Sequence, residues 1–118
     1  TNYAAGYDFY SVESHILEPN TQHSFETGIK SHFGMSTVLL LKSRSGLVSR
    51  QGIDTKAGVI DADYKNTIKV ILRNHGDVPF EIKVGDRISQ GMFFPLDMEY
   101  YPDVSGSERI GGLGSTGV

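Results

Sequence analysis

Short apolar runs and alternating hydrophobic positions dominate the chain, and both patterns are typical of β-strands. Val, Ile, Leu and Phe gather in segments that Gly, Pro, Asn or Asp bound, which is the composition of strands that end in turns. These segments are Ser36–Ser43, Asn66–Asn74, Pro79–Asp86 and Gln90–Met98. No stretch shows a convincing helical period, and many short strands at this spacing predict an all-β sandwich or barrel.

The alternation within residues 80–84 assigns an inner face to one predicted strand. The sequence FEIKV places Phe80, Ile82 and Val84 on one side, which we expect to face the core. Between the strands, clusters of Pro, Asn, Gly and Asp predict turns. The turns are expected at Glu18–Asn20, Asn74–Asp77 and Val84–Asp86.

The chain has 118 residues, which is the size of one domain with its own core. We expect a β core over residues 1–102 and, after Pro102, a flexible glycine-rich arm over residues 103–118 that has little to bury. The arm contains the stretch RIGGLGSTGV, which is either a disordered tail or a strap that becomes ordered on an anion.

Charge and composition exclude several classes of protein. The net charge of −3 argues against a general nucleic-acid binder or a membrane-surface binder, since both need a basic face. The chain has no Cys, and therefore no disulfide, thiolate metal site or Cys nucleophile. Its longest apolar runs are too short to cross a membrane. With no visible signal peptide, we expect an intracellular protein, cytoplasmic or nuclear, and a viral origin stays open.

The segment Ala57–Asn66, AGVIDADYKN, is the first local candidate for a catalytic site. Its pattern predicts a β-hairpin entering its turn. Asp61 could serve there as a general base at the mouth of a pocket, with Tyr64 as a flat wall beneath a ring. On this stretch alone, turn formation by Asp and Asn is the simpler explanation.

Three further segments carry polar groups suited to phosphate or metal binding. The KSRSGL segment, Lys42–Leu47, offers cationic and hydroxyl groups and a free backbone N–H. It lacks the glycine–lysine spacing of nucleotide-triphosphatase loops, and no helix is expected after it. In GDRISQ, Asp86 and Arg87 are expected to pair locally, and Gln90 offers an amide to an acceptor oxygen. Asp8, in AGYDFYS, could lie in the outer shell of a cation, and each segment also has a purely structural explanation.

Taken together and in order, five segments resemble the motifs of the trimeric dUTPase family, the deoxyuridine triphosphate nucleotidohydrolases. The resemblance runs from Ala5 to Gly117, nearly the whole chain, with similar spacing between the motifs. The segments are AGYDFYS, SRSGL, GVIDADY, GDRISQ and RIGGLGSTG. Five motifs in register outweigh the structural explanation of each single segment.

The resemblance implies a distorted jelly-roll-like β-barrel that assembles as a homotrimer, with active sites between subunits. The implied enzyme is a dUTP diphosphatase, which hydrolyses the α–β phosphoanhydride of dUTP to dUMP and pyrophosphate with Mg²⁺ as its cofactor. That reaction limits uracil in DNA and supplies dUMP for dTTP synthesis. The implied partners are dUTP and further copies of the chain, with no direct binding of nucleic acid or membrane.

The resemblance also implies a role for each matched residue. Asp61 would be the catalytic base that deprotonates the water attacking the α-phosphorus, and Tyr64 would pack under the sugar and exclude a 2′-hydroxyl. Asp8 would hold Mg²⁺ through a water, with the ion held mainly by the substrate phosphates. The residues implied to bind substrate are Arg44, Ser45, Gly46 and Gln90 at the phosphates, Gly58 and Lys69 at the uracil, and Arg109, Leu113, Gly114, Ser115 and Thr116 in the C-terminal arm.

Several positions depart from the family pattern. Ser43 stands where a proline usually precedes RSG, Asn66 replaces a usual glycine in the hairpin, and Gly91 takes the place of an apolar strand residue. Asn is tolerable in a turn of this kind because it visits left-handed conformations. In the last motif, the family generally has an aromatic residue after the arginine. Here Leu113 takes that place, and the spacing between Arg109 and Leu113 is one residue shorter than the family's.

Two other functions stay open at this point. The unusual last motif fits a catalytically weak or inactive protein of the dUTPase fold that acts as a nucleotide-gated regulatory module. A dCTP deaminase-like enzyme would share the trimer and the phosphate sites, although Asp61 and Tyr64 fit the hydrolase pattern better.

Overall fold

Nine strands and one short helical turn make up residues 6–97, the part of the chain that the computed structural model describes. The strands are β1 (Tyr7–Tyr10), β2 (His15–Leu17), β3 (Gln22–Glu26), β4 (Thr37–Lys42), β5 (Ile53–Lys56), β6 (Val59–Ile60), β7 (Lys69–Asn74), β8 (Phe80–Ile82) and β9 (Arg87–Pro95). The helical turn η1 (Leu47–Gln51) lies between β4 and β5.

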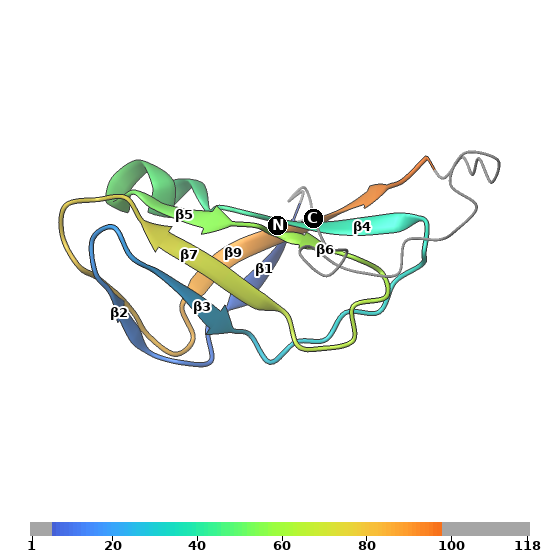
Figure 1. The fold of residues 1–118 in the computed structure, drawn as a ribbon, viewed down its shortest axis with the longest axis horizontal. Coiled ribbons are helices and arrows are strands. Elements are labelled where there is room, and N and C mark those ends of the chain that lie inside the picture. Colours follow the sequence, from blue (N-terminus) through green and yellow to red (C-terminus); the bar gives the residue numbers. More distant parts are fainter. Residues whose placement is uncertain (1–5, 98–118) are drawn as a thin grey trace, which may run out of the picture.

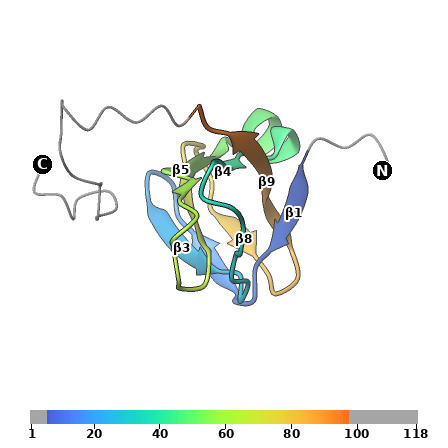
Figure 2. The same cartoon turned by 90° about the vertical axis from the view of Figure 1, so that its right-hand side faces the viewer.

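The strands form three antiparallel sheets that enclose one interior (Figure 1). One sheet has the order β1-β9-β4-β6, the second pairs β2 with β8, and the third has the order β3-β7-β5. In the view of Figure 2, β3 and β1 lie on opposite sides of this interior. The all-β, jelly-roll-like prediction is confirmed, and over residues 6–97 the sheets line the interior without closing into one continuous barrel.

Alternating apolar positions turn one face of each sheet toward this interior. Leu39 and Leu41 on β4, and Val70 and Leu72 on β7, are at most 4% exposed, while the residues between them are half-buried. This period of two is expected because successive side chains of a strand point to opposite faces. The buried apolar side chains of the described residues are Phe9, Leu17, Phe25, Leu39, Leu41, Ile53, Ile68, Val70, Leu72, Ile82 and Ile88.

The glycine at position 91 makes room for an aromatic ring from the neighbouring strand. A Cβ atom at Gly91 would lie 2.6 Å from Phe9 Cε2 and 3.0 Å from Leu39 Cδ1. The ring of Phe9 is itself buried. It therefore occupies the volume that an apolar side chain at position 91 would fill, which accounts for the unexpected glycine on β9.

The expectation that no helix follows Lys42–Leu47 was wrong. η1 begins after Gly46, whose φ of −64° and ψ of −37° are helical, and it ends at Gly52, which has the left-handed φ of 70°. Its 5 residues are too few to show a helical period in the sequence. Among residues 6–97, no helix has the length and apolar character needed to cross a membrane.

The prediction that Val84 faces the core was also wrong. β8 ends at Ile82, and the following turn is closed by a 3.0 Å hydrogen bond from Asp86 N to the Lys83 carbonyl. Val84 lies in that turn and is 65% exposed. The turn itself was predicted, and so was the inward direction of Ile82, which is 1% exposed.

The predicted hairpin around AGVIDADYKN does not form. β6 pairs with β4, whereas β7 pairs with β3 and β5, so this segment crosses from one sheet to another. Asn66 does not need a left-handed backbone there, because the non-glycine residues with positive φ among residues 6–97 are Asn20 and Ala57. Sequence periodicity cannot tell which strand a two-residue strand such as β6 will join.

Candidate functional site

Three of the predicted polar positions stand in a row across neighbouring strands. Gln90 on β9 pairs with Asp8 on β1 at one side and with Lys42 at the end of β4 at the other. Paired residues of antiparallel strands project from the same face of a sheet, and neighbouring strands lie about 4.8 Å apart. The sheet therefore brings all three side chains within reach of one ligand.

The loop Ser43–Gly46 leaves β4 directly beside this row. Gln90 Nε2 donates a hydrogen bond to the Ser43 carbonyl at 3.4 Å. The Arg44 carbonyl accepts two backbone hydrogen bonds from the first residues of η1, which curl the loop back on itself. Arg44 is half-buried and Ser45 is exposed. The structure thus brings together the residues predicted for phosphate binding, Arg44, Ser45, Gly46 and Gln90.

An open cleft of about 510 Å³ beside the loop holds two guanidinium groups, those of Arg44 and Arg87. Arg87 Nη1 lies 3.5 Å from Asp8 Oδ2, so Arg87 pairs with Asp8 and not with Asp86 as predicted. Asp86 instead accepts a 2.8 Å hydrogen bond from the Lys83 backbone N–H. Guanidinium groups bind phosphate oxygens through charge-assisted and often bidentate hydrogen bonds. The cleft also contains the Asp86 carboxylate, so Arg44 and Arg87 are the groups in its lining that suit phosphate oxygens.

The carboxylate of Asp8 meets the requirements of a magnesium site that a phosphate ligand completes. Residues 6–97 contain no group of three or more His, Asp or Glu side chains that could surround an ion by themselves. Mg²⁺ keeps several waters and is usually bound through one or two carboxylates together with substrate phosphates. Asp8 is exposed and pairs with Arg87, which lines the cleft, so the residues present fit that mode of binding.

A second group of predicted residues flanks β6, with Gly58 before the strand and Asp61, Tyr64 and Lys69 after it. Gly58 comes directly before β6, and its carbonyl accepts a 2.7 Å hydrogen bond from Leu41 N. Its φ of 97° is left-handed, and a Cβ atom there would lie 2.7 Å from the Leu41 carbonyl oxygen. Only glycine allows β6 to approach β4 in this way.

Asp61 and Tyr64 are held in a fixed relation by a turn. Tyr64 N donates a 3.1 Å hydrogen bond to the Asp61 carbonyl, and the Tyr64 hydroxyl donates one of 3.0 Å to the Thr67 carbonyl. The Tyr64 ring packs against the core, and Asp61 is partly exposed. Lys69 follows at the start of β7, where it pairs with Glu26. The turn therefore holds the backbones of Asp61 and Tyr64 close together, which suits a base that acts beside a sugar.

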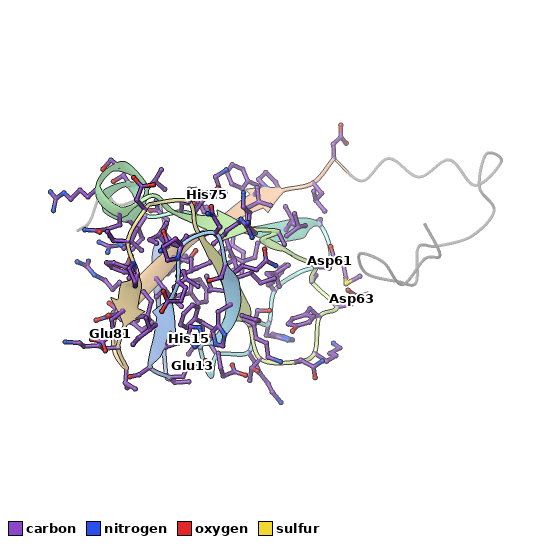
Figure 3. All side chains as sticks on the ribbon, turned by 60° about the vertical axis from the view of Figure 1, so that its left-hand side comes forward. Glu13, His15, Asp61, Asp63, His75 and Glu81 are labelled. Atoms are coloured by element: carbon purple, nitrogen blue, oxygen red, sulfur yellow. The ribbon has the colours of Figure 1, made fainter. Side chains whose placement is uncertain are left out.

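Within the second group, Asp61 lies toward the end of β4 that is farther from the loop Ser43–Gly46. β6 pairs with the middle of β4 and runs away from Lys42. Asp61 continues that direction to the level of Val38, which is about 13 Å of strand from Lys42. Figure 3 shows Asp61 at the end of the molecule away from η1. Within one copy of the chain, Asp61 and Arg44 therefore lie toward different ends of β4.

Asp54 is a residue near the loop that the sequence analysis did not single out. Its Oδ1 accepts a 2.5 Å hydrogen bond from Ser43 Oγ, and its Oδ2 accepts one of 3.3 Å from Lys56 Nζ. The hydrogen bond from Ser43, assisted by Lys56, lowers the pKa of Asp54. Nothing in the sequence IDTK indicates this contact, because the partner hydroxyl belongs to Ser43, which follows a different strand, β4.

A second ionisable cluster ties β2 to β3, and Figure 3 labels two of its members, Glu13 and His15. The rings of His15 and His23 stack at 3.7 Å, and His23 Nε2 lies 2.6 Å from Glu13 Oε1. The hydrogen bond with His23 lowers the pKa of Glu13. None of the predicted site residues belongs to this cluster, which serves to hold the two strands together.

The remaining predicted residues belong to the C-terminal arm. They lie outside residues 6–97, the described part of the chain, and are Arg109, Leu113, Gly114, Ser115 and Thr116.

The β fold thus combines a cleft lined by two arginines, an exposed carboxylate that pairs with one of them and a separate Asp–Tyr turn, an arrangement suited to the class of proteins that bind a phosphorylated ligand. The dUTPase family model matches residues 1–117 of the chain. The chain is also 42% identical to the deoxyuridine 5'-triphosphate nucleotidohydrolase of Candida albicans, over 97% of this chain and 76% of that protein. The chain therefore belongs to the dUTPase family.

Solved structures of similar proteins share the fold. The dUTPase from Streptococcus mutans is 29% identical, with a TM-score of 0.78 over 86% of this chain and 85% of that one. A mutant dUTPase from phage phi11 of S. aureus, a structure described as revealing how a structural Mg(II) ion is coordinated, has a TM-score of 0.80 at 22% identity. It covers 96% of this chain and 87% of its own.

Proposed function

We propose that the chain hydrolyses dUTP to dUMP and pyrophosphate, at sites that more than one copy of the chain completes. The observation that carries this proposal is the family membership across nearly the whole chain. The geometry supports it, since Arg44 lines the cleft, Ser45 and Gly46 follow it in the same loop, and Gln90 is hydrogen-bonded to the start of that loop. The reaction removes dUTP, which limits uracil in DNA, and provides dUMP for dTTP synthesis.

Asp61 is the proposed general base. Its carboxylate takes a proton from a water molecule while the water oxygen bonds to the α-phosphorus. The bond from that phosphorus to the bridging oxygen then breaks, and pyrophosphate leaves with the electron pair. A positioned base of this kind contributes about 10²–10⁴-fold to the rate.

The phosphate-binding part of the site is formed by Arg44, Ser45, Gly46 and Gln90. Arg44 neutralises phosphate charge, while the Ser45 hydroxyl and the backbone N–H groups of the loop donate hydrogen bonds. Asp8 would hold Mg²⁺ through a water, next to the same cleft. When bound, the ion offsets negative charge on the phosphates and favours in-line attack.

The nucleoside part is assigned to the segment after β5. Tyr64, fixed by its hydroxyl and by core packing, provides the surface under the sugar and leaves no room for a 2′-hydroxyl. Backbone groups near Gly58 and Lys69 would read the uracil edge. Such a site rejects cytosine because its buried groups would be left without partners.

The separation of Asp61 from Arg44 supports an assembly with shared sites, and we propose a homotrimer. A second cleft, of about 500 Å³, is lined mainly by apolar groups, among them Tyr7, Ile29 and Phe93. Exposed apolar surface of this kind marks interaction sites on monomers. A further copy of the chain would cover it.

The arm over residues 103–118 is proposed to complete the site from another copy. Arg109 would bind the γ-phosphate and Leu113 would cover the uracil, with Gly114, Ser115 and Thr116 at the phosphates. Since the substrate belongs to the deoxynucleotide pool, we place the protein inside the cell.

A four-nucleotide assay tests the proposed function. Pyrophosphate release is measured with Mg²⁺ and equal concentrations of dUTP, dCTP, dTTP or UTP, and we expect release from dUTP to dominate. Asp61→Asn should abolish turnover while retaining most of the affinity for dUTP. Ammonia release from dCTP would instead indicate a deaminase. Normal turnover by Asp61→Asn would show that Asp61 is not the general base.

A further inference from the structure

The phosphate-binding loop is attached to the third sheet through a single hydroxyl. Ser43 is the first residue after β4 and comes directly before Arg44. Its Oγ donates a 2.5 Å hydrogen bond to Asp54 Oδ1 and accepts one of 2.8 Å from the Thr55 backbone N–H. Both partners lie on β5, which pairs with β7 and not with β4.

The main chain of the same residue is held from the opposite side. The Ser43 carbonyl accepts the hydrogen bond from Gln90 Nε2 on β9, at 3.4 Å. The residue is thus fixed by its side chain to one sheet and by its backbone to another. Because both the side chain and the backbone of Ser43 are hydrogen-bonded, the loop that starts there has little conformational freedom at its first residue.

A lysine neutralises the charge of Asp54, which lies near the loop that is proposed to bind phosphate. Lys56 Nζ lies 3.3 Å from Asp54 Oδ2. An uncompensated carboxylate next to the loop would repel a polyphosphate, whereas an ion pair of this kind has no net charge. The hydrogen bond from Ser43 also favours the ionised form of Asp54, which makes it a strong acceptor.

We propose that Ser43 and Asp54, with Lys56 as counter-ion, are positioning residues that fix the loop Arg44–Gly46 for binding a triphosphate chain. The inference deepens the proposed function and rests on it for the identity of the substrate. It also gives a reason for the departure at position 43. A proline would restrict the backbone directly, and here a side-chain hydrogen bond to a second strand restrains it instead.

The network is tested with Ser43→Ala, Asp54→Ala, the double variant and the conservative Ser43→Thr. Two measurements are made on each, the kcat and KM for dUTP hydrolysis and the calorimetric affinity for inorganic triphosphate. We expect Ser43→Ala to raise the KM and weaken triphosphate binding about tenfold, with a smaller change in kcat. Ser43→Thr keeps a hydroxyl and should bind as the unaltered chain does.

The double variant separates a network from two independent effects. If Ser43 acts through Asp54, the triphosphate affinity of the double variant should be no lower than that of the single variant with the lower affinity. Thr21→Val is the matched control, because it removes a hydroxyl hydrogen bond to the Glu18 carbonyl in a turn outside the site. It should leave KM and affinity unchanged.

The outcomes distinguish this proposal from the proposed function. If the chain binds triphosphate through Ser43 and Asp54 but does not hydrolyse dUTP, the positioning role of these two residues stands and the proposed dUTP hydrolysis is refuted. Equal triphosphate affinity of Ser43→Ala and the unaltered chain, additive effects of the two substitutions, or no triphosphate binding at all would overturn the network. Should Asp54→Ala fail to fold, as urea unfolding would reveal, the two Ser43 variants decide alone.

Discussion

At the scale of single residues, a few positions have their identity set by one close neighbour. Gly91 leaves room for the Phe9 ring, and Gly58 lies against the Leu41 carbonyl. The hydroxyl of Ser43 meets the carboxylate of Asp54. The residue type at such a position is explained only when its neighbour is known. A departure from the family pattern at one position therefore cannot be interpreted from the sequence alone.

Gly91→Ala should destabilise the protein, because its Cβ atom would lie 2.6 Å from Phe9 Cε2. Overpacking of this kind costs about 1–3 kcal/mol. In the double variant with Phe9→Leu, the smaller side chain should recover part of the loss. Urea unfolding of the two single variants and the double variant measures this coupling, and strictly additive effects would contradict the packing explanation.

The stabilising contribution of Asp54 should depend on pH. Its folded-state pKa lies below the ordinary value, chiefly through the hydrogen bond from Ser43. A carboxyl group with a lowered pKa contributes stability above its unfolded pKa and loses it as the pH falls through the folded pKa. The difference in unfolding free energy between the unaltered chain and Asp54→Asn should therefore be largest near neutral pH and shrink in acid. A difference that grows in acid would have the wrong sign.

At the scale of secondary-structure elements, alternation predicted the strands but not their partners. The apolar runs correctly indicated β4, β7 and β9, since period two along a half-buried strand leaves a clear pattern. The two-residue strand β6 and the five-residue turn η1 are too short to show any period. Pairing depends on contacts between distant segments, which is why the predicted hairpin at AGVIDADYKN was wrong.

Gly58→Ala should disrupt the approach of β6 to β4. The substitution forces an alanine into a φ of 97° with its Cβ atom 2.7 Å from a backbone oxygen, so we expect a loss of about 1–3 kcal/mol. Gly46→Ala is the matched control, because its φ is −64° and a Cβ atom there has no neighbour within 4 Å. Thermal unfolding of both variants compares the two positions. An equal loss at both would contradict the steric argument.

At the scale of the whole molecule, the resemblance predicted the residues of the candidate site and also that the active sites lie between subunits, and both stay predictions. The ordered motifs indicated which residues act together. The fold then placed Asp61 and Arg44 toward different ends of β4, a separation that follows from strand register and that no motif spacing contains. In the proposed function, Arg44 of one copy of the chain therefore meets Asp61 of another.

The most direct test of that requirement combines two inactive variants in one assembly. Chains carrying Asp61→Asn and chains carrying Arg44→Ala are given different affinity tags, coexpressed, and purified through both tags in turn. Each variant alone should release almost no pyrophosphate from dUTP. The mixed assembly should regain activity, because sites form that combine Arg44 of one copy with Asp61 of another. A mixed assembly of verified composition that stays as inactive as the separate variants would contradict the shared site.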